Sequence, residues 1–531
     1  MSRLRQEVLY LPSRPSRGAR SQAPAGRRTI VVGGGIAGVA AATVLCERGV
    51  EVTLIEREPT LGGRAGGFEK VLATGERVHM ERGFHAFFRQ YYNLRALLRR
   101  IDPELSMLVP LPDYPILGPA GLVQSFRGLP KRTPLQIMAL TWQTPHLKLR
   151  DLLRVNALAA LEMLRFDATE TYARFDGVSA RDYLDSLGFP ETARRMLFDV
   201  FSHSFFNPES QLSAAELLMS FHFYFTGNSE GLIFDVMQKP LSRAVWQPFE
   251  AFLRARGVNV LTDTAVTQVS RTSNGSLRVE CAPAYESDSS ACAGQAHESD
   301  DLVLALDLAG LQRVVAASPA LANLAQIDKL RATLPFAVQR LWLDRPLRPE
   351  RAAFAGTTGV GLLDNISCYE RFQDESAAWA RRHGGSVVEL HAYAVPTELS
   401  ERAIKDDLLA GLHQFYPETQ QARILDECWL LRQDCPAFEP GSSQLRPTPQ
   451  TVLSDVVLAG DFVSVPFPCA LMERATAAGF LAANTLLARQ GVAPEPLSSV
   501  PRQGLFSGWR GVDRTRTAER VVAAVAAERG S

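Results

Sequence analysis

A glycine-rich turn between a short apolar strand and a helix constrains this chain more than any other feature. Residues 29–32 are apolar and β-forming, residues 33–38 read Gly-Gly-Gly-Ile-Ala-Gly, and a helix is predicted from 39 to 48. A second apolar strand follows over 50–55. A strand, a GxGxxG turn and a helix in this order are typical of the βαβ unit that binds a dinucleotide. The sequence therefore predicts an α/β fold with a Rossmann-type domain.

The residues of this turn have separate tasks in such a unit. Gly33 permits the tight turn, Gly35 lets the backbone approach a pyrophosphate, and Gly38 lets the helix pack against the strand. Together with Ala37 they place phosphates at a helix N-terminus, where free N–H groups and the helix dipole favour negative charge. Glu56 ends the second strand, where a carboxylate accepts hydrogen bonds from a ribose and repels a 2′-phosphate. This pattern disfavours NADP and leaves NAD and FAD open.

A second glycine-rich segment, residues 61–67, favours FAD over NAD. It surrounds Arg64 with four glycines, among them Gly63. Such a loop can pass close beneath a long cofactor, and the arginine offers a fork of donors to pyrophosphate or ribityl oxygens. An extended FAD needs this second segment, whereas NAD does not. The predicted cofactor is therefore FAD.

Three distant segments complete the predicted cofactor site. A strand ends in Gly460-Asp461, where the carboxylate is placed to bind a ribityl hydroxyl. A helix begins near Met472-Glu473, and its N-terminal N–H groups and dipole would stabilise negative charge on a reduced flavin ring. Val266 lies on a predicted strand whose edge offers backbone groups to adenine.

Length and composition fit a globular protein with one large insert. The chain has 531 residues, of which 46% are apolar and 21% charged, and its formal net charge is zero. We predict a Rossmann-type FAD-binding domain in several segments, a mixed-sheet substrate domain and a helical insert. The expected boundaries are 1–28 for a disordered basic arm, 29–95, 235–306 and 450–490 for the FAD-binding segments, 96–234 for a helical region that contacts substrate or membrane, 307–449 for the substrate domain and 491–531 for a C-terminal tail.

The sequence offers no membrane span, secretory signal or metal-binding pattern. No apolar run approaches the roughly 18 residues that a bilayer span needs. The seven cysteines are scattered without a CxxC pair, which fits reduced thiols and signals neither zinc nor an iron–sulfur cluster. We therefore expect a cytoplasmic protein without a nucleic-acid partner, held by peripheral contacts at the inner face of the membrane.

Two segments bear on that membrane contact, and each has two interpretations. Residues 1–28 hold seven arginines against the single acid Glu7, which is typical of a solvated tail or of a segment that contacts anionic lipid headgroups. Around Leu152-Leu153, Leu158, Leu161 and Met163-Leu164, leucines alternate with Arg150, Arg154 and Arg165. That pattern fits the core face of an ordinary helix or an amphipathic face lying on a membrane.

The order of these motifs resembles that of the FAD-dependent amine oxidase and carotenoid desaturase superfamily, over residues 29–487. The block 79–88, His-Met-Glu-Arg-Gly-Phe-His-Ala-Phe-Phe, is similar to that of ζ-carotene desaturases, and the resemblance makes Gly83 a cofactor-binding residue. The run 82–99 looks closest to bacterial carotene desaturase/methyltransferases, the carotenoid φ-ring or isorenieratene synthases. One residue departs from the family: Arg474 stands where relatives usually have glycine.

The resemblance implies an amine oxidase/phytoene desaturase-like fold and the aromatisation of the β-ring of a carotenoid. A ring carbon would lose hydride to the flavin, one geminal methyl group would migrate and a proton would be lost. The arene requires the loss of four hydrogen atoms per ring in all. The methyl shift is intramolecular, so S-adenosylmethionine is not required. A quinone or another acceptor would reoxidise the flavin. Glu81 and His85 are the candidate proton acceptors, with bonds to backbone amides and an ordinary structural histidine as their alternative interpretations.

Aromatic residues and the overall activity also have alternative interpretations. The rings either stabilise a carbocation through their faces or form plain core. The aromatic candidates are Phe84, Phe87, Phe88, Phe201, Phe205, Phe206, Phe221, Phe223, Tyr224 and Phe225. The alternative functions are an acyclic carotene desaturase or isomerase of the ζ-carotene type, and a flavin amine oxidase with a small polar pocket and peroxide as product.

Overall fold

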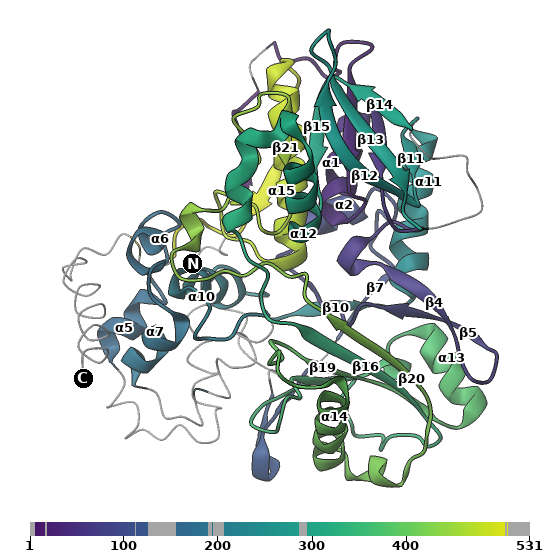
Figure 1. Ribbon diagram of the computed structural model, residues 1–531. Helices are drawn as coiled ribbons and strands as arrows, with labels where there is room; N and C mark the ends of the chain where they lie inside the picture. Colours follow the sequence, from purple (N-terminus) through teal and green to yellow (C-terminus); the bar gives the residue numbers. More distant parts are fainter. Residues whose placement is uncertain are drawn as a thin grey trace.

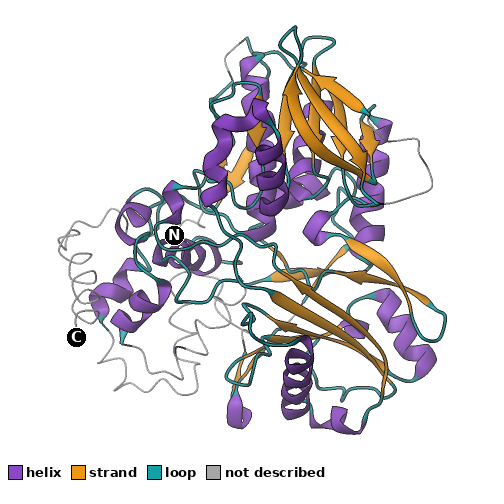
Figure 2. Ribbon diagram, in the orientation of Figure 1, coloured by secondary structure: helices purple, strands orange, loops and turns teal. Residues whose placement is uncertain are grey.

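Three bodies make up the protein: a five-stranded sheet with its helices, a seven-stranded sheet with its helices, and a group of helices beside both (Figures 1 and 2). The computed structural model describes residues 6–15, 18–111, 113–125, 156–188, 194, 206–285, 295–504 and 507. This arrangement confirms the predicted α/β fold, with a Rossmann-type domain, a mixed-sheet domain and a helical insert.

The five-stranded sheet is parallel and collects strands that lie far apart in the sequence. In spatial order its strands are β11 (Asn259–Leu261), β3 (Glu51–Ile55), β2 (Arg28–Val32), β15 (Asp301–Leu304) and β21 (Val456–Leu458). Because successive side chains of a strand point to opposite faces, Val31 packs on one side and Ile30 and Val32 on the other. On the first side lie α1 (Ile36–Glu47) and α15 (Leu471–Arg489). Burial on both faces explains why these strands are almost continuously apolar.

An antiparallel layer and a helix cover the other face of this sheet. The layer comprises β12 (Thr264–Arg271), β13 (Leu277–Pro283) and β14 (Ala296–Ser299), and the helix is α12 (Leu308–Ala317). Asp307 caps α12, since its side chain accepts a 2.6 Å hydrogen bond from the Gly310 N–H. Leu311 of α12 packs in the same core cluster as Leu304 of β15. The expected domain boundary at 307 is therefore too early, because the next strand after α12 that belongs to the second sheet is β16 (Phe336–Leu343).

The seven-stranded sheet forms the second body and is mixed. Its strands in order are β20 (Ile424–Arg432), β16, β19 (Ser386–Ala392), β18 (Asn365–Cys368), β17 (Phe354–Thr357), β8 (Ile116–Leu117) and β9 (Val123–Gln124). Leu408 of α14 (Glu401–Phe415) packs on one face, and Trp379 of α13 (Asp374–His383) packs on the other. β8 and β9 come from the region expected to be mostly helical. That expectation is wrong for this stretch, where β8 and β9 pair antiparallel and β8 joins the sheet through β17.

The helical region is the third body. It contains α5 (Ala157–Glu162), α6 (Glu170–Phe175), α7 (Ala180–Leu187) and α10 (Ala214–Phe221). The expected amphipathic face lies mainly outside the described residues, around Arg150 and Leu152. Its described part faces inward, because Met163 is buried and the Arg165 side chain lies beside Glu162. Among the residues that the structure describes, no helix has both the length and the apolar character needed to cross a membrane.

Residues 6–15 and 18–28 of the expected disordered arm are ordered. β1 (Glu7–Leu9) pairs antiparallel with β22 (Leu497–Ser499), and the Ala23 N–H donates to the Arg48 carbonyl at 2.7 Å. The prediction failed because β1 finds its partner at the far end of the chain. The same pairing orders residues 497–499 of the expected tail.

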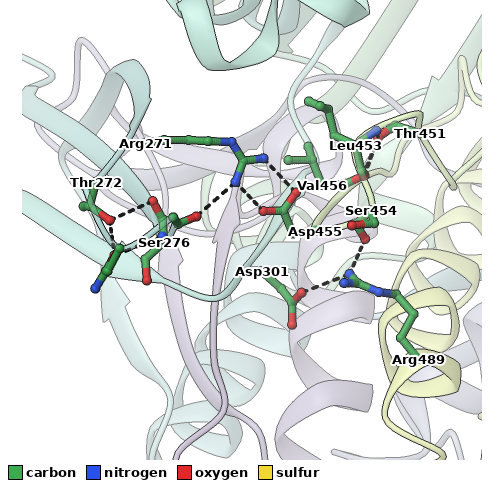
Figure 3. Close-up of polar contacts among 12 residues, drawn as sticks. Arg271, Thr272, Ser276, Asp301, Thr451, Leu453, Ser454, Asp455, Val456 and Arg489 are labelled. Carbon is green, nitrogen blue, oxygen red and sulfur yellow. Dashed lines mark hydrogen bonds and ion pairs between the residues drawn. The ribbon is translucent and has the colours of Figure 1, made fainter.

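Ion pairs hold the amino end of the five-stranded sheet together (Figure 3). Asp301, at the start of β15, accepts two hydrogen bonds from Arg27 and lies 3.3 Å from Arg489 of α15. Next to it, Arg271 of β12 forms a two-pronged pair with Asp455 at 2.7 and 2.9 Å. We call these contacts the basal ion pairs. They connect the parallel sheet, the antiparallel layer and α15 at one end.

Candidate active site

The glycine turn lies at the opposite, carboxyl end of the sheet and packs too closely for side chains. Gly33 has a φ of 104°, and a Cβ there would lie 2.4 Å from the Ala305 carbonyl oxygen. A Cβ on Gly38 would lie 1.8 Å from the Gly33 oxygen. These are the packing roles expected of both glycines.

Gly35, in contrast, has room for a side chain at the start of α1. The nearest atom to a Cβ built there is the Gly63 Cα, at 3.8 Å. No side chain caps the helix, and its first turn, which includes Ala37, holds no acid. The first N–H groups of α1 are therefore available to a phosphate.

Glu56 secures the turn from the neighbouring strand. Its carboxylate accepts hydrogen bonds from the Gly34 N–H at 2.5 Å and the Glu58 N–H at 2.8 Å. Burial raises the pKa of this carboxyl group, while the two N–H donors oppose the shift. Glu56 thus orients the glycine turn, and its position at the end of β3 is the one expected for a ribose contact.

The second glycine-rich loop lies directly against the first. The Gly62 N–H donates to the Gly34 carbonyl at 2.9 Å, and Gly62 and Gly63 have positive φ values of 123° and 55°. Arg64 then reaches Asp461, with 2.6 Å between Nη2 and Oδ1, across 397 residues of sequence. Gly460, just before Asp461, has a φ of 153°. The structure thus brings together the two segments that the sequence assigned to one cofactor.

The helix α15 begins beside these loops, and Glu473 turns away from them. α15 has no side-chain cap at Ala470, so its first N–H groups, including that of Met472, are free of a capping side chain. The Glu473 carboxylate accepts from the N–H groups of Asn93 and Leu94, both at 2.9 Å, at the start of α2 (Tyr92–Leu98). Burial raises the pKa of Glu473 to about 7 against these donors. The side chain of Glu473 therefore holds α2, which contradicts the prediction that Glu473 itself contacts the cofactor.

Val266 lies on β12, the outer strand of the antiparallel layer, as expected for an edge strand. Two residues before it, the Thr264 N–H donates to the Glu56 carbonyl at 3.0 Å, which joins β12 to the end of β3. A β-bulge between Val266 and Gln268 interrupts the pairing with β13. Val266 thus lies near the adenosine end of a dinucleotide that follows the glycine turn.

The residues at this end of the sheet fit an extended dinucleotide. The space in front of Gly35 and the uncapped start of α1 suit the pyrophosphate. Glu56 and Val266 lie on the adenosine side, and Arg64 with Asp461 lies on the other.

Gly83 and His85 follow β5 (Arg77–Glu81) in the block that resembles carotene desaturases. Gly83 has a φ of 126°, and a Cβ there would lie 2.9 Å from His391 Cε1. The His85 Nδ1 lies 2.7 Å from the Gly83 carbonyl oxygen and can donate to it, which leaves Nε2 as the acceptor. Burial lowers the pKa of His85 to about 4, so its ring is neutral at pH 7.

Glu81 is buried and accepts hydrogen bonds from several donors, so it is not a free base. It is 3% exposed and accepts from Arg340 and from Gln373, both at 3.0 Å, and from the Leu241 N–H at 3.3 Å. Burial raises the pKa of this carboxyl group, and Arg340 opposes the shift. This geometry favours the alternative interpretation, in which Glu81 binds a backbone amide, over the role of proton acceptor.

A buried network of charged residues in the seven-stranded sheet adjoins Gly83 and was not predicted from the sequence. Glu389 accepts from Arg340 Nε at 2.8 Å and lies 2.7 Å from His391 Nε2, and Arg340 also lies over the ring of Tyr369. Burial opposes ionisation, but Arg340 and His391 lower the pKa of Glu389 to about 2. Charged residues two apart inside an apolar strand share one face. The charged residues 389 and 391, two apart in an apolar strand, were the sequence pattern from which this network could have been predicted.

The aromatic candidates divide into core and partly exposed rings. Phe87, Phe223, Tyr224 and Phe225 are buried, which favours the core interpretation, and Phe201 and Phe205 lie outside the described residues. Phe84 stacks on Phe354 at 4.5 Å, and Phe206 meets Tyr393 edge-on at 4.8 Å. The candidates that remain partly exposed are Phe84, Phe88, Phe206 and Phe221.

The fold and this two-loop site define a flavin-dependent oxidoreductase. The sequence profile of the flavin containing amine oxidoreductases matches residues 36–487, and the chain belongs to this family. It is 49% identical over 493 residues to a carotenoid phi-ring synthase of Streptomyces griseus, covering 91% of this chain and 93% of that protein. A carotenoid phi-ring synthase of Chlorobaculum tepidum is 28% identical, with 91% of each chain covered.

More distant relatives share the fold. A zeta-carotene desaturase of Synechocystis is 24% identical, over 87% of this chain and 98% of that protein. Cyclohexylamine oxidase from Brevibacterium oxydans superimposes with a TM-score of 0.61 at 14% identity, over 88% of this chain and 98% of that chain. Putrescine oxidase bound to putrescine superimposes with a TM-score of 0.58 at 15% identity, over 94% and 99%. These two structures confirm the fold expected from the sequence.

Proposed function

We propose that this protein is an FAD-dependent desaturase that aromatises the β-ring of a carotenoid, with an intramolecular methyl shift. The observation that carries the proposal is the 49% identity to the Streptomyces griseus carotenoid phi-ring synthase along nearly the whole of both chains. Identity to a zeta-carotene desaturase is only 24%, so the acyclic alternative has weaker support.

FAD is the proposed cofactor because the site is longer than NAD requires. The glycine turn and Glu56 would hold the adenosine diphosphate part, and the Arg64–Asp461 pair and the start of α15 lie beyond it. Bound FAD would supply a two-electron acceptor next to the substrate. The oxidation of one β-ring to an arene removes four hydrogen atoms, so each ring requires two such oxidations.

The protein residues near Gly83 would orient the ring and receive the proton. His85 has a neutral ring at pH 7, which suits a proton acceptor that works at neutral pH. The partly exposed rings of Phe84 and Phe206 would face a transient cation with their π electrons. Exclusion of water by these apolar groups would prevent its capture as an alcohol.

A carotenoid is confined to the bilayer, which supports a peripheral attachment of this protein to the cytoplasmic face of the inner membrane. The same location gives access to a membrane quinone as electron acceptor. Co-sedimentation of the purified protein with vesicles that contain anionic lipid tests the attachment, and quinone-dependent turnover under anaerobic conditions tests the acceptor.

Expression in a bacterium that accumulates β-carotene tests the proposed reaction. Mass spectrometry of the pigments should show a loss of four hydrogen atoms per ring with the carbon number unchanged, and the Gly35→Val variant serves as the inactive control. Unchanged β-carotene beside a further desaturated acyclic precursor would favour the ζ-carotene type instead. Unchanged carotenoids together with peroxide release from soluble amines would favour an amine oxidase.

A further inference from the structure

A single carboxylate of the helical region holds both ends of the segment that carries Asp461 and the start of α15. One carboxylate oxygen of Glu216 in α10 accepts a hydrogen bond from Arg474 at 2.8 Å. The other oxygen accepts hydrogen bonds from Arg446 and from the Tyr172 hydroxyl. The Glu216 and Arg474 side chains are both 5% exposed, and that of Arg446 is 7% exposed. We call this group the Glu216 clamp.

Each arginine of the clamp also holds backbone of residues 461–474, which we call the cradle segment. Arg446 donates from Nε and Nη2 to the carbonyls of Phe462 and Val463, both at 3.1 Å, directly after Asp461. Arg474 donates from Nε to the carbonyl of Cys469 at 2.9 Å, directly before α15. The two ends of the cradle segment are therefore fixed through two arginines that meet on one glutamate.

Stability alone does not account for such an arrangement. A buried triad of charges is costly to desolvate, and apolar replacements of similar volume are often as stable or more so. The ring of Phe438 contacts both guanidinium groups, which lie 4.8 and 4.7 Å from its centre, so apolar packing is already available there. What the charges add is a directional link between α10 and the cradle segment.

We propose that Glu216 is a positioning residue, through which the helical region sets the cradle segment against the flavin and holds the positively charged Arg474 at the start of α15. The clamp contains two arginines and one carboxylate, so its own charge is positive. A positive charge near a helix N-terminus adds to the dipole in favouring an anionic, reduced flavin. The inference rests on the proposed binding of FAD at this site.

Glu162 offers a matched control in the same helical region. It is also 5% exposed and also lies between two arginines, Arg165 and Arg174. Its contacts stay within the helical region and touch no residue of the cradle segment in the described part of the chain. Glu162→Gln therefore removes a comparable buried charge without disturbing the cofactor site.

FAD titration of the full-length apoprotein compares Glu216→Gln with Glu162→Gln. We expect Glu216→Gln to weaken FAD binding on the order of tenfold, a usual size for coupling between sites, and Glu162→Gln to leave it unchanged. Equal affinities in the two variants would overturn the inference while leaving the flavoprotein assignment intact. Wild-type protein that binds no FAD would overturn the proposed function, and the inference with it.

The midpoint potential of the bound FAD distinguishes an electrostatic effect of the clamp on the flavin from a general loss of structure around the cradle segment. Glu216→Gln removes a negative charge and should raise the potential, whereas Arg474→Met removes a positive charge and should lower it. Shifts in the same direction would contradict the electrostatic part of the inference. Arg474→Lys is a milder variant if Arg474→Met does not fold: it keeps the charge, loses one of the two contacts, and should weaken FAD binding without lowering the potential.

Discussion

Polar groups lie at both ends of the five-stranded sheet, but the two ends differ in whether these groups have partners within the protein. At the amino end, the basal ion pairs match each charge with a partner, as for Arg271 with Asp455 (Figure 3). At the carboxyl end, α1 and α15 both begin without a side-chain cap, and Gly35 leaves space in front of α1. At the amino end, which we call the closed end, the polar groups only stabilise the fold. At the carboxyl end, which we call the open end, free N–H groups remain available to a ligand.

The largest effect is expected from a side chain at the open end. Gly35 has an extended backbone, with φ −73° and ψ −177°, and space for a Cβ, so Gly35→Val should fold normally. The valine would occupy the place of the pyrophosphate, and the purified variant should lose its bound flavin. Flavin absorbance and a thermal melt measure both properties. A variant that is still yellow would refute the placement of the phosphates.

Disruption of the closed end should affect stability and spare the cofactor. Asp301 accepts two hydrogen bonds from Arg27, so Asp301→Asn should cost about 2 kcal/mol of unfolding free energy. Denaturant unfolding measures this cost, and FAD titration should give the wild-type affinity. A large loss of FAD affinity would show that the two ends are not independent.

Two matched arginine–aspartate pairs sharpen the comparison further. Arg64→Met breaks the pair with Asp461 at the open end and should weaken FAD binding roughly tenfold, the loss of about 1.4 kcal/mol. Arg271→Met breaks the pair with Asp455 at the closed end, where partial exposure limits the cost to about 1 kcal/mol of stability or less. The same assays apply to both variants. Equal changes in FAD affinity would contradict the contrast.

The smallest effect is expected from pH. Because burial lowers the pKa of His85 to about 4, its ring stays neutral and activity should not decline between pH 8 and pH 5 on its account. The unfolded chain binds that proton near its ordinary pKa of 6.5, so this site loses folding stability as the pH falls from about 6.5 to about 4. A rate profile with a step near pH 6.5 that His85→Gln abolishes would contradict the assignment of a neutral ring to His85.

The sequence predicted those parts of the site that depend on local motifs. The turn at Gly33 and Gly38 packs as its spacing required, and Arg64 meets Asp461 because both follow strands whose carboxyl ends share one edge. The direction of a side chain within a helix depends on what packs against it. For that reason the engagement of Glu473 with α2 was not predicted.

Long-range pairing accounts for the other differences. Arg340 and Glu389 meet only because β16 and β19 pair, and the register of two strands does not follow from either strand alone. The basic arm was expected to be disordered because its composition is polar, yet β1 pairs with β22. Composition describes the tendency of a segment in isolation and contains no information about a partner elsewhere in the chain.

Anaerobic mixing of the FAD-loaded protein with β-carotene in vesicles tests the central claim most directly. If the flavin at the carboxyl end of the sheet accepts the hydride, its oxidised absorbance should disappear in a single turnover, at the rate at which a ring-desaturated carotenoid forms. Conversion of the carotenoid while the flavin stays oxidised, or reduction of the flavin by soluble amines with β-carotene unchanged, would contradict the account.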